Sequence, residues 1–223
     1  MPDVFWFAIT RLGEALIVLP ILLALMLWLV ARSRAHRLVL VWTLLLSIAV
    51  LITTATKVAF IGWGIGNARW DFTGVSGHAM FAAVVFPLLL RATVSSAPPD
   101  WHRASIVLGY AFALLIAVSR VKVGAHSWSE VAAGFAVGTA ASGFALTRVH
   151  MPAVDAPRLL IVGVAVWLVS MPAGAPPSPT HGWVTRLALA MSGRDVPYTR
   201  QDLYRRVQLP AGFERHLPPT PTL

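Results

Sequence analysis

Residues 16–30 read LIVLPILLALMLWLV, a run without a charged residue. A charge inside the hydrocarbon core of a bilayer is costly, so a run of this kind favours a membrane-spanning helix. The first charge in the chain is Asp3, and no basic segment precedes the run, which argues against a cleaved signal peptide. We therefore predict that this stretch is the core of a retained first span that begins near Val4.

The composition of the chain also indicates a membrane protein. Of its 223 residues, 57% are hydrophobic and 12% are charged, whereas a soluble domain carries about 25% charged residues. The formal net charge of +9 fits a protein oriented in a bilayer with anionic headgroups. No nucleic-acid-binding motif is present, so we expect the lipid bilayer, and not nucleic acid, as a partner. The absence of cysteine excludes disulfides and thiolate metal sites, and the sequence leaves the oligomeric state open.

Six apolar segments follow one another along the chain. Several are shorter than the roughly 20 residues that a spanning helix needs, but their flanks extend them. We predict an all-α fold, a polytopic membrane bundle of six transmembrane helices within residues 1–172. The cores of the six segments are Leu16–Val30, Leu38–Ile52, Ala79–Val94, Ala104–Val118, Val131–Leu146 and Leu159–Met171. In the fifth segment Gly134 and Gly138 form a Gly-xxx-Gly pair, which we expect to serve helix packing.

The composition changes at Ala173. The stretch AGAPPSPT is a proline-rich linker, and residues 183–191 are predicted to form a short interfacial helix. The last stretch, RHLPPTPTL, is expected to be disordered. We therefore describe residues 173–223 as a linker and a short polar C-terminal tail.

Basic residues set the expected orientation in the cell membrane. They gather in the loops after the first, third and fifth segments, which all face one side, and the positive-inside rule makes that side the cytoplasm. Both termini then lie outside. The tail arginines alone would favour the cytoplasm, but no seventh segment exists to carry the tail across. The basic residues of these loops are Arg32, Arg34, Arg37, Arg91, Arg103, Arg148 and Arg158.

The remaining polar residues fall in two other loops. The loop after the second segment contains Lys57, Arg69 and the triplet Ser-Gly-His at 76–78, and the loop after the fourth contains SRVKVGAHSWSE at 119–130. Each loop follows an even number of crossings. Both therefore lie on the same, extracytoplasmic face, where His78 and His126 can meet.

These residue types suit a multiply charged anion. Arginine offers a planar fork for phosphate oxygens, and lysine acts as a point charge. The start of the third helix presents free backbone N–H groups, and Gly77 lets the backbone come close to an anion. His126 and Glu130 share a face if the fifth helix already begins at His126, so the carboxylate would orient the ring.

The triplet Ser-Gly-His and the run Ser-Arg-x5-His-x3-Glu resemble the motifs of the type-2 phosphatidic acid phosphatase family. That family includes lipid diphosphate phosphatases, and its active-site pattern recurs in vanadium haloperoxidases. The resemblance covers about Lys57–Glu130, with the histidine of the second run as its most specific element. Six spans match the membrane branch of the family.

The resemblance implies hydrolysis of a lipid phosphate or diphosphate through a phosphohistidine, without a metal or another cofactor. His126 would be the nucleophile, Glu130 would orient it, and His78 would protonate the leaving group. The phosphate would be held by Lys57, Ser76, Gly77 and Arg120.

The chain departs from the family pattern in three places. Glu130 stands where the family usually has Asp, and Val75 stands where it has Pro. In the family, six residues separate the lysine from an Arg-Pro pair. In this chain Lys57 is followed by VAFIGWG, and no Arg-Pro stands at that distance. Arg69 or Lys122 is therefore the candidate for the missing phosphate contact.

Two further charge pairs are predicted near these loops. Arg11 and Glu14 are three residues apart in the first segment and can pair with each other. Asp71 is a candidate partner for Arg69.

Other functions remain open at this point. The same phosphohistidine could serve a lipid phosphotransferase, and a relative with a degenerate first motif could bind a lipid without turning it over. Two histidines on one membrane face could also ligate a haem, which would make the protein a redox module. The sequence does not choose among phosphatidate, phosphatidylglycerol phosphate and polyprenyl diphosphate as substrate.

Overall fold

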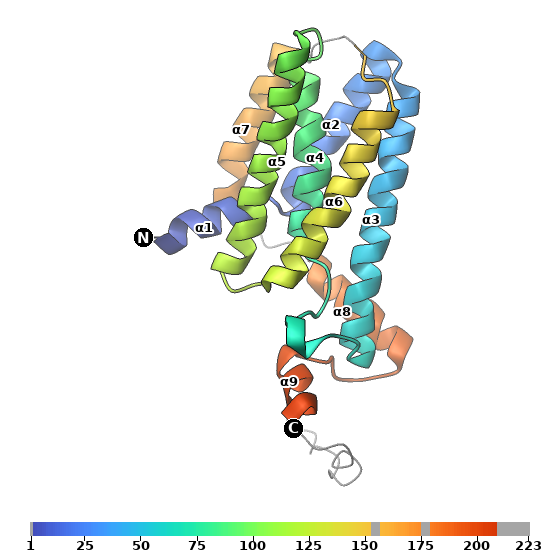
Figure 1. The fold of residues 1–223 in the computed structure, drawn as a ribbon, viewed down its shortest axis with the longest axis vertical. Helices are drawn as coiled ribbons and strands as arrows, with labels where there is room; N and C mark the ends of the chain where they lie inside the picture. The colour runs from blue at the N-terminus through green and yellow to red at the C-terminus, as the bar shows by residue number, and fades with distance from the viewer. Residues whose placement is uncertain (1, 153–156, 175–178, 209–223) are drawn as a thin grey trace.

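The structure, a computed structural model, describes residues 2–152, 157–174 and 179–208, and these contain helices and no extended strand. Helices α2 to α7 lie alongside one another as a bundle, with α8 and α9 at one end (Figure 1). The predicted all-α fold is confirmed. The helices are α1 Pro2–Arg11, α2 Ala15–Ser33, α3 His36–Trp63, the 3-10 helix η1 Ala68–Trp70, α4 Gly77–Thr93, α5 Pro99–Lys122, α6 Trp128–Arg148, α7 Arg158–Gly174, α8 Thr180–Ser192 and α9 Arg200–Gln208.

Four of the described helices, α2, α3, α5 and α6, are long and apolar enough to cross a membrane. Helices α4 and α7 are apolar but have 17 residues each. At 1.5 Å per residue, 17 residues extend about 25 Å, which is less than the hydrocarbon thickness of about 30 Å. The length and apolar composition of these helices indicate a membrane protein. The expected number of six spans remains a prediction.

The first apolar segment is not one continuous span from Val4. Helix α1 ends at Arg11 and α2 begins at Ala15, and α1 lies across the bundle instead of continuing α2 (Figure 1). The turn between them contains Gly13, where an added Cβ would come within 2.6 Å of the Ile116 side chain. The chain therefore bends close against α5. At this turn Arg11 Nε lies 3.7 Å from Glu14 Oε1, so the predicted pair forms.

Helix α4 forms the centre of the bundle. Eleven of its residues are buried, and it packs against α5, α6 and α2. A helix that is apolar all round buries its whole circumference against protein. This explains why α4 reads as a continuous apolar run and shows no polar face.

Two glycines of α6 allow the backbones of α6 and α4 to touch. An added Cβ at Gly134 would collide with the carbonyl oxygen of Ser76, and one at Gly138 with that of Met80. The predicted packing role of this glycine pair is confirmed. Because Ser76 is the residue that precedes α4, the contact at Gly134 also fixes where α4 begins.

The chain beyond residue 172 returns to the bundle. Helix α8 includes the predicted helix at 183–191 and packs along α3. The Tyr198 N–H then donates to the Ile61 carbonyl at 2.9 Å, and α9 lies below η1 (Figure 1). The linker residues 175–178 and residues 209–223, which include the stretch predicted to be disordered, lie outside the described residues.

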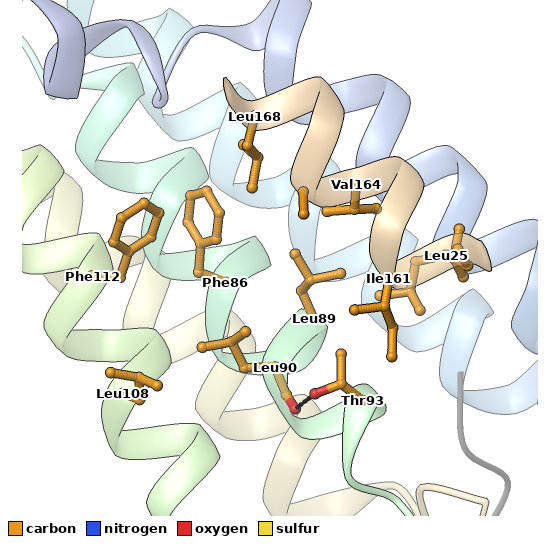
Figure 2. Close-up of a pocket in the computed structure, with 12 residues that line it drawn as sticks. Leu25, Phe86, Leu89, Leu90, Thr93, Leu108, Phe112, Ile161, Val164 and Leu168 are labelled. Atoms are coloured by element: carbon orange, nitrogen blue, oxygen red, sulfur yellow. Dashed lines mark hydrogen bonds between the residues drawn. The ribbon is translucent and has the colours of Figure 1, made fainter. Parts of the chain in front are cut away.

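An apolar cavity of about 360 Å³ opens between α2, α4, α5 and α7. Figure 2 shows its wall of hydrocarbon side chains, with Phe86 and Phe112 side by side, their ring centroids 4.7 Å apart. On α4 the cavity begins at Phe86, about two helical turns beyond His78. The cavity is therefore suited to hydrocarbon and lies apart from the polar loops.

The Gly134 contact predicts a measurable cost of adding one methyl group. We expect Gly134→Ala to destabilise the folded protein by about 1–3 kcal/mol, because the clash is with backbone that cannot rotate away. Thermal unfolding of the purified protein in detergent measures this. Gly163→Ala in α7 is the control, since nothing lies within 4 Å of its added Cβ. Equal unfolding temperatures for the two variants would contradict the packing assignment.

Candidate active site

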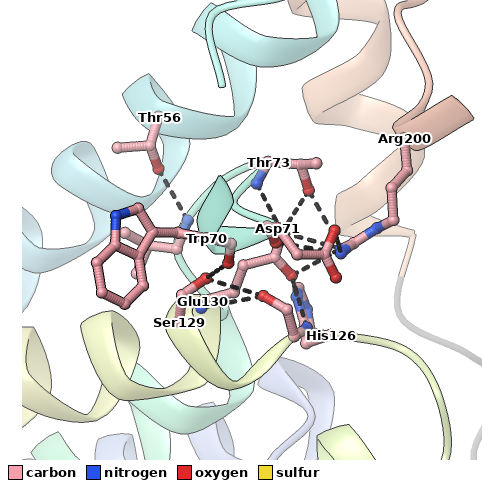
Figure 3. Close-up of polar contacts among 10 residues, drawn as sticks. Thr56, Trp70, Asp71, Thr73, His126, Ser129, Glu130 and Arg200 are labelled. Atoms are coloured by element: carbon pink, nitrogen blue, oxygen red, sulfur yellow. Dashed lines mark hydrogen bonds and ion pairs between the residues drawn. The ribbon is translucent and has the colours of Figure 1, made fainter. Parts of the chain in front are cut away.

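The two polar loops meet at one end of the bundle, around the side chain of Glu130 (Figure 3). This side chain has no exposed surface, and its Oε2 lies 2.7 Å from His126 Nδ1. A carboxylate at this position fixes the proton on Nδ1 and leaves the lone pair on Nε2. His126 is therefore oriented as a nucleophile or a base.

The contact between Glu130 and His126 does not need a helix that begins at His126. Helix α6 begins at Trp128, and Ser127 is its N-cap. The Ser127 hydroxyl accepts from the Glu130 N–H at 3.4 Å, and Glu130 Oε2 accepts from the Ser127 N–H at 3.2 Å. This capping box holds Glu130 at the start of α6, so the geometry of the helix terminus orients the histidine.

Glu130 also accepts hydrogen bonds from outside its own helix. The Thr73 N–H donates to Oε1 at 2.7 Å, and the Thr73 hydroxyl donates to the same oxygen. Arg200 Nη2 lies 2.9 Å from each carboxylate oxygen. A buried charge is tolerated when it is paired and hydrogen-bonded, and Glu130 satisfies both conditions.

The loop that contains Thr73 is held by the helices on either side of it. The Val75 N–H donates to the Thr56 hydroxyl at 3.1 Å, and Ser129 donates to the Trp70 carbonyl at 2.6 Å (Figure 3). Gly74 has φ +143°, a conformation open to glycine. Its added Cβ would come within 2.9 Å of Lys57 Cγ. Glycine thus lets the loop pass directly over the lysine.

Lys57 and Arg120 are the two predicted cations that the structure brings to the cluster. Lys57 lies within electrostatic reach of Arg120 and Glu130. Arg120 Nη1 donates to the Thr10 hydroxyl at 2.8 Å, while its Nε is buried with no hydrogen-bond partner among the described residues. An anion bound beside Lys57 can therefore meet a free edge of the Arg120 guanidinium.

The backbone joins Arg120 to His126. The last turn of α5 ends in a loop whose Ala125 and His126 N–H groups both donate to the Arg120 carbonyl, at 3.0 and 3.2 Å. Gly124 supplies the left-handed residue of this loop, with φ +70°. The five-residue spacing of the motif therefore closes the turn that sets the histidine beside the arginine.

Ser76, Gly77 and His78 form the entry to α4. His78 lies within electrostatic reach of Arg120, His126 and Lys57, which is consistent with both histidines lying at the same end of the bundle. The Ser76 N–H donates to the Glu130 carbonyl at 3.0 Å, so this N–H is not free for a phosphate. Its hydroxyl is buried and has no partner among the described residues. The N–H groups of Gly77, His78 and Ala79, in the first turn of α4, face no helical carbonyl, since the first helical bond is from Met80 to Ser76.

Arg69 and Lys122 lie outside the cluster. Both side chains are exposed, and among the described residues neither has a polar contact with the cluster. Asp71 does not pair with Arg69, because its carboxylate pairs with Arg200. The cation that enters the site beside the motif residues comes from α9, a segment in which the sequence shows no motif.

Burial lowers the pKa of His126 below its ordinary value. The hydrogen bond to Glu130 opposes this shift, while the positive charge of Lys57 adds to it. The ring is therefore neutral near pH 7 and has its lone pair available. Within residues 2–152, 157–174 and 179–208, no three His, Cys, Asp or Glu side chains gather as a set of metal ligands.

A histidine oriented by a carboxylate, beside a lysine and an arginine, is an arrangement suited to binding and attacking an anionic group. Comparison with known proteins identifies the family. Residues 56–152 match the model of the PAP2 superfamily. The chain is 32% identical over 206 residues to a protein of Klebsiella pneumoniae described as "Uncharacterized 22.5 kDa protein in cps region", and the match covers 90% of this chain and 98% of that protein. No solved structure matches the chain.

The chain belongs to the PAP2 superfamily, and the predicted resemblance is confirmed. Members of this superfamily are generally phosphatases, which indicates phosphatase-type activity. The matched residues 56–152 include Lys57, the Ser-Gly-His triplet, Arg120, His126 and Glu130. They do not include Arg200.

The lowered pKa of His126 can be measured directly. We expect its ring to titrate below about 6.5, the ordinary histidine value. The measurement follows the NMR chemical shifts of histidine-labelled protein in detergent as the pH is changed. The His126 signal is identified because it is missing from the spectrum of the His126→Gln variant. The sign follows from burial, which disfavours the charged ring, so protonation needs a lower pH. A midpoint at or above the ordinary value would contradict this environment.

Proposed function

We propose that this protein is an integral membrane phosphatase that hydrolyses a lipid phosphate or diphosphate monoester through a phosphohistidine. The observation that carries the proposal is the fully buried Glu130 carboxylate 2.7 Å from His126 Nδ1, with Lys57 and Arg120 beside the ring. This arrangement frees Nε2 for attack on a phosphorus atom and surrounds the attacked group with positive charge.

In the first step Nε2 of His126 attacks the phosphorus, and the bond to the leaving oxygen breaks. His78 gives a proton to that oxygen. The ring gains positive charge as the P–N bond forms, and Glu130 stabilises it through the Nδ1 proton. In the second step His78 takes a proton from water, the water oxygen attacks the phosphorus, and the P–N bond breaks to release phosphate. The two steps return both histidines to their starting state.

The phosphate oxygens would be held by charge and by the backbone. Lys57 and the free Nε edge of Arg120 neutralise the transferring group, where most of the catalytic stabilisation of phosphoryl transfer arises. The Gly77 and His78 N–H groups at the start of α4 add donors with the positive end of the helix dipole. The buried Ser76 hydroxyl, which has no partner among the described residues, is a further donor.

Several features support a lipid as the substrate and an extracytoplasmic site in the cell membrane. The site lies at one end of a bundle of membrane helices, so a headgroup can bind there while its hydrocarbon stays beside the helices. The α2–α3 and α4–α5 connections lie at the opposite end (Figure 1), where Arg32, Arg34 and Arg103 are found. By the positive-inside rule that end is cytoplasmic, and all six apolar helices then cross the membrane.

Phosphate release in the presence of a metal chelator tests this function. Protein purified in detergent is supplied with phosphatidate and, separately, with a polyprenyl diphosphate. We expect turnover by the unmutated protein and a loss of about 10³-fold or more in His126→Ala, because the nucleophile is gone. The control is His181→Ala, an exposed histidine of α8 that should retain full activity.

The other outcomes of this assay are distinct. Release of no phosphate from either lipid would overturn the proposal. Lipid binding without turnover would then indicate a non-catalytic relative, transfer of phosphate to an acceptor other than water would indicate a phosphotransferase, and a haem absorption band would indicate a redox module.

Under the proposed function the predicted cations differ in importance. We expect Lys57→Gln to lower kcat/KM for phosphate release by about 10²–10³-fold, since it removes a charge that stabilises the transition state. Lys122→Gln and Arg69→Gln should stay within about twofold of the unmutated protein, because both side chains are exposed outside the cluster. The measurement is kcat/KM for phosphate release from the same lipid by each variant. Equal losses in Lys57→Gln and Lys122→Gln would contradict this assignment.

A further inference from the structure

Arg200 joins the C-terminal helix α9 to the centre of the candidate site. Its Nη2 lies 2.9 Å from both oxygens of Glu130 and 3.4 Å from the Thr73 hydroxyl. Its Nη1 donates to the Asp71 carbonyl at 3.2 Å and also pairs with the Asp71 carboxylate. The guanidinium therefore bridges the loop before α4 and the carboxylate that orients His126 (Figure 3).

Arg200 is positioned by contacts that the tail makes for itself. The Thr199 N–H donates to Asp202 Oδ2 at 2.9 Å, and the Asp202 N–H donates back to the Thr199 hydroxyl at 3.4 Å. This is a capping arrangement at the start of α9. One turn on, Leu203 is buried in a cluster with Val58 and Ile61 of α3. The helix is thus anchored to the bundle on the side from which Arg200 extends.

The Glu130 carboxylate is fully buried and therefore depends on a charged partner for its stability. Glu130 has no exposed side-chain surface, whereas 34% of the Arg200 side chain remains exposed. Removing one partner of a buried ion pair leaves an uncompensated charge, which is costly. The planar guanidinium contacts both Glu130 oxygens through Nη2 and Asp71 through Nη1, so it ties the carboxylate to the loop before α4. The remaining donors, Thr73, Ser127 and the neutral His126 ring, carry no charge.

We propose that Arg200 is a positioning residue of the phosphatase reaction, and that the C-terminal helix completes the site by holding Glu130 against His126. This inference rests on the proposed function. Arg200 acts through Glu130 and not on the phosphate, because both of its terminal nitrogens already contact acidic partners. The family match ends at residue 152, so the role belongs to a part of the chain outside the matched motifs.

The role has a chemical signature besides the rate. His126 faces Glu130 from α6, Lys57 from α3, Arg120 from α5 and His78 from α4. Arg200 reaches it only through Glu130. Without Arg200 the negative charge of Glu130 is less compensated and attracts the His126 proton more strongly. The acidic limb of the pH–rate profile should then move to higher pH. A loosened tail that exposes the His126 ring would move the limb in the same direction, so the unfolding temperature and the Arg200→Lys variant are needed to distinguish the two causes.

The experiment compares four forms of the full-length chain: the unmutated protein, Arg200→Gln, Arg200→Lys and Arg205→Gln. Arg205 lies in the same helix and is exposed, so its variant controls for loss of a tail charge. Phosphatidate and polyprenyl diphosphate are supplied as before, and kcat, KM, the pH profile and the unfolding temperature are measured.

We expect Arg200→Gln to lower kcat by about 10–100-fold, in the range found when an outer partner of an active-site group is removed. Its KM should stay within about twofold, and its acidic limb should move to higher pH. Arg200→Lys should recover part of kcat, since it keeps the charge without the planar fork, and Arg205→Gln should match the unmutated protein.

The outcomes separate the two proposals. If the unmutated protein turns over lipid and His126→Ala does not, but Arg200→Gln keeps kcat and its acidic limb, the role of Arg200 is wrong and the proposed function stands. The role is also wrong if Arg200→Gln loses activity with a lowered unfolding temperature and no recovery in Arg200→Lys, since general destabilisation then accounts for the loss. If the unmutated protein releases no phosphate, the proposed function and this role fall together.

Discussion

The carboxylate of Glu130 is buried at the point where α6 begins, and most of the site is arranged around the need to satisfy it. A carboxylate without water must receive hydrogen bonds and an opposite charge from the protein. The donors come from the α6 cap, from the loop before α4 and from α9, so meeting that need draws three separate parts of the chain together. The orientation of His126 follows from the same arrangement. Glutamate suits this position because its length lets it close the capping box and reach the ring at once.

The second constraint is the close approach of α4 and α6. Gly134 brings the α6 backbone against the carbonyl of Ser76, and the Ser76 N–H is bound to the Glu130 carbonyl. The two helices that supply His78 and Glu130 are therefore joined through backbone atoms at the site itself. Backbone contacts do not depend on rotamers, so the distance between the backbones of His78 and Glu130 is set by the bundle.

Sequence periodicity was sufficient to predict the helices, and the motifs of the family resemblance supplied the candidate site residues. Neither was sufficient where the chain reverses or returns. The parity of crossings brought His78 and His126 to one face, and the glycine spacing predicted the α6 contact. The break between Arg11 and Ala15 escaped prediction because hydrophobicity continues across it, while the turn depends on the packing of Gly13 against α5. The contact between His126 and Glu130 was expected on the condition that the helix begins at His126. The helix begins at Trp128, with Ser127 as its N-cap, and the capping box brings the two side chains together instead.

Arg200 could not be predicted for a different reason. It is one of several tail arginines, and its partner Glu130 is 70 residues away in sequence. Nothing local distinguishes it from Arg194 or Arg205. A signal was present in the preceding Thr199 and the following Asp202, which mark a helix start, but a helix start does not say what lies opposite. Arg120, in contrast, was predicted because it lies in the Ser-Arg-x5-His run, and Lys57 because the family resemblance implies a lysine before the Ser-Gly-His triplet.

The contacts of Arg120 and Glu130 extend to both ends of the described chain. Thr10 of α1 holds the Arg120 guanidinium, and Arg200 of α9 holds Glu130, so the polar cluster joins residues separated by almost the whole polypeptide. Closing loops of that length costs conformational entropy, and the contacts of the complete bundle offset this cost. The cluster is therefore a late product of folding, and a chain that has inserted its first helices but has yet to dock its last ones contains the motifs without the assembled site.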